Sequence, residues 1–93
     1  MEETLTITDK LSKLESLLSQ VSELANDIKK DAENGVKFSK IQKTIAFNRN
    51  DSAMCEYFYE LISKWEDVHF LAERTIINAE SSIEKMKTEN MKF

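Results

Sequence analysis

The sequence predicts an all-α fold: a long helical hairpin with a broken first arm, two long helices plus a short middle helix, which completes a helical bundle or coiled coil with another chain. The 93 residues include one glycine and no proline, whereas tight β turns need glycine, proline or Asn-Gly pairs. The apolar residues recur at helical spacing, and their stripes are wider than two helices can cover. The length allows a single domain, residues 1–93.

The first long helix is expected over about 8–33. Its apolar seam advances in alternating steps of four and three, through Ile7, Leu11, Leu14, Leu18, Val21, Ala25, Ile28 and Ala32. Leu17 and Leu24 add a third apolar position to each heptad and widen the stripe, as in helices that contact two neighbours. Asn34 and Gly35 are expected to form the left-handed cap that ends the helix.

A short amphipathic helix is expected over about 36–47, because Phe38, Ile41 and Ile45 recur there at helical spacing. The polar run that follows contains several cap-forming side chains and predicts a reversal of the chain at 48–51.

The second long helix is expected over about 52–90. Its apolar seam is predicted through Met54, Phe58, Leu61, Trp65, Val68 and Ala72, and then through Ile76, Ala79, Ile83 and Met86. The step from Ala72 to Ile76 is four residues where three is due. Such a stutter rotates the apolar stripe, so the two halves of the helix are expected to face different neighbours.

A second apolar stripe on this helix predicts a surface that binds a partner. Tyr59, Phe70 and Ile77 fall within about 20° of one another at 100° per residue, away from the predicted seam. Tyr59, Phe70 and the nearby Trp65 are aromatic residues, the side-chain types enriched at protein interfaces, and with Ile77 they are the predicted partner-binding residues. The expected partner is another protein chain, either a second copy in a homo-oligomer or an unlike helical chain.

Charge is unevenly distributed along the chain, whose net charge is −4. Residues 29–50 hold two acids and six bases, whereas the segments on either side are acidic. Lys37, Lys40 and Lys43 share one helical face, which is expected to meet an acidic protein surface, to contact phosphates of a nucleic acid, or to serve only as a solvated face of the helix. The pI near 5.0 argues against nucleic acid.

Residues able to carry chemistry are few. Cys55 and His69 lie 14 residues apart on one predicted helix, about 21 Å along its axis, too far for a nucleophile and its base. Glu66, His69 and Glu73 share a face, but di-iron bundles need two Glu-x-x-His elements and further carboxylates. We therefore expect no catalytic residues, no metal and no cofactor.

The compartment is expected to be cytoplasmic or otherwise intracellular. Cys55 is the only cysteine, and an unpaired thiol suits a reducing environment. The chain shows no signal-peptide pattern and no apolar run long enough to cross a bilayer, so no membrane is expected as a partner.

These observations predict a non-enzymatic protein–protein interaction module that acts by helix–helix packing in an oligomer or complex. One alternative is a small acidic inhibitor of the phage or antitoxin type, which blocks a basic groove of a target enzyme with its acid-rich arms. Another is nucleic-acid binding through the lysine-rich middle segment.

Overall fold

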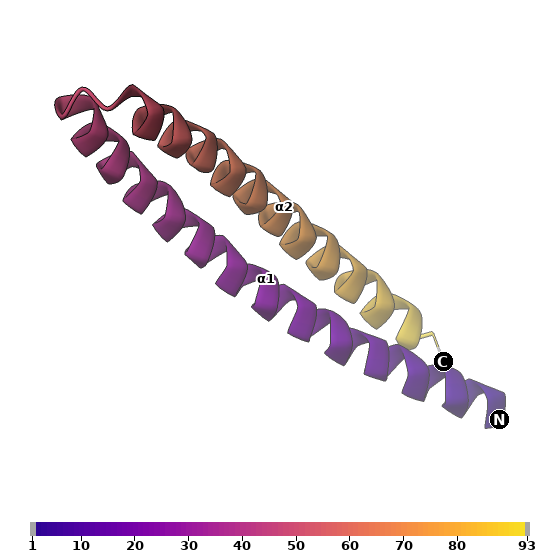
Figure 1. Ribbon diagram of the computed structural model, residues 1–93. Helices are drawn as coiled ribbons and strands as arrows, with labels where there is room; N and C mark the ends of the chain where they lie inside the picture. Colours follow the sequence, from indigo (N-terminus) through magenta and orange to yellow (C-terminus); the bar gives the residue numbers. More distant parts are fainter. Residues whose placement is uncertain (1, 93) are drawn as a thin grey trace.

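Two long helices form an antiparallel hairpin, so the predicted all-α helical hairpin is confirmed (Figure 1). The computed structural model describes residues 2 to 92, and the side chains of residues 6 to 92. Helix α1 spans Glu2–Asn48 and helix α2 spans Ser52–Asn90. The rod measures 72 × 14 × 14 Å, and 47 helical residues at about 1.5 Å each account for its length. The start of α1 and the end of α2 lie at the same end of the rod.

The prediction of a broken first arm is wrong, because α1 runs without interruption through Asn34 and Gly35. Gly35 does not adopt the left-handed conformation that would cap a helix. It lies instead against Trp65 of α2: a Cβ at position 35 would stand only 2.5 Å from Cδ2 of the indole ring. The glycine therefore makes room for a bulky ring, and the expected short helix over 36–47 is the last quarter of α1.

The reversal of the chain lies between Asn48 and Ser52, within the polar run that predicted it. Asn50 has a positive φ of 57°, a conformation that asparagine tolerates better than most residues. The side chain of Asp51 accepts a hydrogen bond of 3.1 Å from the backbone nitrogen of Met54 and caps α2. The turn is thus fixed by local polar contacts.

The most deeply buried residues between the two helices are mostly small. The buried apolar residues of the described chain are Ala25, Ala32, Ala46, Ile62, Ala72 and Ala79. Ser39 is also fully buried and lies one heptad after Ala32 and one before Ala46. Because small side chains let two helices approach closely, the seam is narrow, and larger seam side chains such as Phe58 and Trp65 are only partly buried.

The seam of α1 is rotated relative to the predicted one. Leu14 and Val21, expected between the helices, are 41% and 44% exposed, whereas their neighbours Glu15 and Ser22 are partly buried. The apolar stripe of α1 is wider than α2 can cover, and α2 contacts the edge of the stripe that carries the alanines. The predicted positions Leu11, Leu18, Ala25 and Ala32 remain on the seam.

On α2 the seam keeps regular steps of three and four over its full length. The buried and partly buried positions that follow this spacing are Cys55, Phe58, Ile62, Trp65, His69, Ala72, Ile76, Ala79, Ile83, Met86 and Asn90. Ile62 and His69 occupy the seam positions that were predicted for Leu61 and Val68. With these positions the step of four from Ala72 to Ile76 is the regular one, so the predicted stutter is absent. One face of α2 therefore follows α1 throughout.

Candidate protein-binding surface

An exposed apolar face runs along one side of the hairpin and is built by both helices. Because the seam advances in seven-residue steps, residues seven apart keep the same position relative to the neighbouring helix. Large apolar side chains occupy most positions beside Ala25 and Ala72 on this side and several positions one or more heptads away, and polar residues such as Asp31, Lys64 and Asn78 interrupt the row. We call these residues the apolar face: Leu14, Leu17, Val21, Leu24, Ile28, Phe38 and Ile45 of α1, and Met54, Tyr57, Leu61, Val68 and Leu71 of α2.

The apolar face contains a groove at mid-length of the rod, where the two helices meet. Val21, Leu24 and Ile28 line it from α1, and Val68 and Leu71 line it from α2, around a volume of about 270 Å³. The alanines of the seam form part of its lining. Leu24 and Leu71 are 62% and 63% exposed, so both leucines of the groove face solvent.

Polar contacts join the helices on the opposite side of the hairpin, which we call the polar flank. His69 Nε2 lies 3.1 Å from Glu33 Oε1, and its Nδ1 lies 3.6 Å from Glu73 Oε1. Lys29 Nζ lies 3.6 Å from the same oxygen of Glu73. These side chains are partly exposed, so each pair contributes about 1 kcal/mol or less. Among residues with described side chains, no group of three or more His, Cys, Asp or Glu is arranged to hold a metal ion.

The sequence-predicted partner residues are divided between the seam and the polar flank. Tyr59, Phe70 and Ile77 are 63%, 60% and 58% exposed, which leaves them available for a partner. Phe70 lies about 100° around α2 from Leu71, so these three side chains lie apart from the apolar face. Trp65 is partly buried against Gly35 and serves the hairpin contact.

The predicted lysine patch lies on the polar flank beside acidic side chains. Lys37 and Lys40 line a hollow of about 420 Å³ together with Glu33 and Glu66. Their positive charges are thus accompanied by two carboxylates. Lys43 is partly buried, and its ammonium group lies 5.0 Å from the centre of the Tyr59 ring, a cation–π contact.

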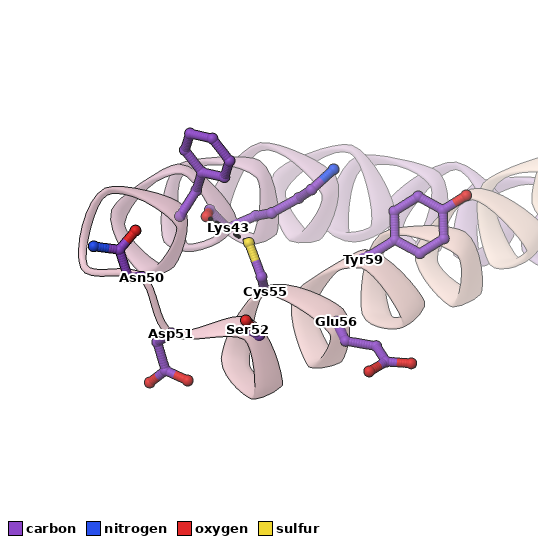
Figure 2. A pocket seen from close by; sticks show the side chains of 8 residues that line it. Lys43, Asn50, Asp51, Ser52, Cys55, Glu56 and Tyr59 are labelled. Atoms are coloured by element: carbon purple, nitrogen blue, oxygen red, sulfur yellow. Dashed lines mark hydrogen bonds between the residues drawn. The ribbon is translucent and has the colours of Figure 1, made fainter.

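A second hollow lies beside the turn, between Lys43, Cys55 and Tyr59 (Figure 2). Cys55 points toward α1, where its Sγ donates a weak hydrogen bond of 3.5 Å to the carbonyl oxygen of Lys43. The carboxylates of Asp51 and Glu56 point away from this hollow. The thiol therefore packs between the helices, the role expected of a structural cysteine.

The sequence did not indicate that Leu14, Val21 and Ile28 would stay exposed, because it placed them between the helices. The feature of the sequence that could have revealed this surface is the pair Leu17 and Leu24. A third apolar position in every heptad indicates a second contact surface, and these two leucines lie on it.

Comparison with known proteins gives no relative: no family model, no curated protein and no solved structure matches this chain. In the part of the chain that the structure describes, neither helix has a stretch that is long and apolar enough to cross a membrane.

Proposed function

We propose that this protein is a non-enzymatic protein–protein interaction module that packs its apolar face against helices of another chain. One observation carries the proposal: Leu24 and Leu71, from different helices, stand exposed on either side of one groove, while most of the buried apolar residues between those helices are alanines. Contiguous apolar surface of this kind marks interaction sites in proteins.

The distribution of side chains favours helices as the binding partner. The groove follows the line along which α1 and α2 meet, so its shape suits an elongated apolar ridge. A helix that presents apolar residues every three or four positions supplies such a ridge, and this is how amphipathic helices bind in grooves. Burying one exposed leucine stabilises a complex by about 1.5–3 kcal/mol.

The two alternatives rest on weaker support. Binding of nucleic acid through the lysines would place phosphates beside Glu33 and Glu66, which line the same hollow as Lys37 and Lys40 and repel anions. An acidic inhibitor would use the acid-rich ends of the helices. The net charge of −4 is small for a mimic of nucleic-acid phosphates, and the exposed leucines would have no part in that mechanism.

The test compares two matched pairs of substitutions in protein used to capture partners from its native cells. Leu24→Ser with Leu71→Ser removes the rims of the groove. Phe70→Ser with Ile77→Ser removes side chains of similar exposure from the polar flank. We expect the first pair to abolish capture of the bound chain and the second pair to preserve it, with helical content followed by circular dichroism in both.

The reverse result, loss of capture only with Phe70→Ser and Ile77→Ser, would show that the partner binds the stripe of Tyr59, Phe70 and Ile77 instead. Capture that survives both pairs would contradict helix packing through either surface. In that case, removal of Lys37, Lys40 and Lys43 and titration with oligonucleotides at several salt concentrations would test the nucleic-acid alternative directly.

A further inference from the structure

We propose that the apolar face is covered by the same face of a second copy of this chain, in a four-helix bundle whose two turns lie at opposite ends. The inference rests on the proposed function, since it names the partner of the same surface. Three properties of the described hairpin carry it: the area it exposes, the position of the groove along the rod, and the distribution of charge.

The exposed area is larger than that of a compact protein of the same size. The hairpin exposes 7223 Å², whereas a compact monomer of 10.8 kDa exposes about 5,500 Å². The difference is about 1,700 Å² per chain, and interfaces of obligate homodimers bury about 1,000–2,500 Å² on each partner. One interface with a second copy of equal length is therefore large enough to remove the excess.

The groove lies where a two-fold axis would let two rods overlap completely. Residue 25 is the midpoint of α1, and Leu24, Ala25 and Leu71 line the groove. An axis through this point and perpendicular to the rod superimposes the full 72 Å of one copy on the other. The exposed Leu24 and Leu71 of each copy then face the groove of the other, and such a contact is self-complementary, as two-fold symmetry requires.

Charge selects the antiparallel arrangement of the two rods. The half of the hairpin that contains the turn, residues 29–72, holds seven acids and seven bases. The open half, residues 1–28 and 73–93, holds ten acids and six bases. A parallel dimer would bring two ends of charge −4 together, and like charges at close range repel. An antiparallel dimer places each acidic half beside a neutral half.

Sedimentation equilibrium of the purified full chain tests the association. We expect a dimer at micromolar concentration, and we expect Leu24→Ser with Leu71→Ser to raise its dissociation constant by at least about a hundredfold, since four buried leucines are lost per dimer. The control pair, Phe70→Ser with Ile77→Ser, should change the constant by less than about threefold, as expected of side chains outside the contact. The proposal would be overturned if the protein were still a monomer at about 100 μM, or if only the control pair of substitutions abolished the dimer.

Distance measurement between spin labels tests the orientation without altering the apolar face. The labelled protein carries Cys55→Ser and Glu56→Cys, so that the label is on an exposed position near the turn. The label lies beside Lys43 of α1, which is 18 residues or about 27 Å from residue 25 at the middle of the rod, so the antiparallel dimer predicts a separation of about 55 Å. A separation below about 25 Å would show a parallel dimer and overturn the arrangement.

The two proposals fail on different results. If the chain is monomeric but capture from native cells still depends on Leu24 and Leu71, the second copy is excluded and the binding surface stands with an unlike helical partner. If capture does not depend on these leucines, the proposed function fails, whatever the state of association.

Discussion

The contact between Gly35 and Trp65 gives the sharpest test of the hairpin, through the substitution Gly35→Ala. In a helix interior this change normally stabilises a protein by about 1 kcal/mol. Here the new Cβ would lie 2.5 Å from Cδ2 and 2.7 Å from Nε1 of the indole, about 1 Å closer than an ordinary contact. Overpacking of this kind costs about 1–3 kcal/mol, and a rigid ring between two helices cannot bend away. We expect a net loss of about 1–2 kcal/mol in the free energy of unfolding.

Urea denaturation followed by circular dichroism at one fixed protein concentration measures this change. Asn34→Ala is the matched control, since Asn34 is exposed in the same helical turn and should give only the gain from helix propensity, about 0.5 kcal/mol. In a Trp65→Leu background the overlap is removed, so Gly35→Ala should become stabilising by about 1 kcal/mol. If Gly35→Ala stabilises the unaltered protein as much as Asn34→Ala does, the indole does not lie against Gly35 and the observed register of the hairpin is incorrect.

Substitutions at three further positions test the seam and the turn by the same denaturation measurement. Ser39 is fully buried and its hydroxyl has no hydrogen-bond partner in the described structure, so Ser39→Ala should raise the free energy of unfolding by about 1 kcal/mol, whereas a loss would indicate that the hydroxyl is bonded. Asp51→Ala removes the cap of α2 and should lower it by about 1 kcal/mol, and Asp51→Asn, which retains an acceptor, should lower it much less. Asn50→Ala should cost about 1 kcal/mol because of the positive φ, while Asn50→Gly should change stability by less than about 0.5 kcal/mol; equal effects of the two would contradict that conformation.

The hairpin could be predicted from the sequence because its signals are local. Long helical periodicity, the absence of proline and the polar run around Asn50 each act within a few residues. The role of Gly35 could not be predicted in this way. A glycine that ends a helix and a glycine that accommodates a ring look alike in the sequence, and the residue that decides between them, Trp65, lies 30 positions away across the hairpin.

The candidate surface was predictable only in part. The sequence shows that α1 carries three apolar positions per heptad, but it does not show which edge of that stripe faces α2. The choice depends on pairing the alanines of both helices, Ala25 and Ala32 with Ala72 and Ala79, a property of the two helices together. The angular spacing of Tyr59 and its companions did predict their exposure, and their part in binding stays a prediction.

The composition of the seam also connects folding with binding. Five of the six buried apolar residues of the described chain are alanines, and one buried methyl group contributes about 0.8 kcal/mol. Ordering the backbone opposes folding at every residue, and side chains this small offset little of that cost. Most of the leucines, which form the core in many helical proteins, lie here on the apolar face, where a partner that covers them would stabilise the fold. Binding and stability should therefore change together: loss of Leu24 and Leu71 weakens association and lowers the helicity of the dilute chain, whereas a hairpin stable by itself would lose association alone.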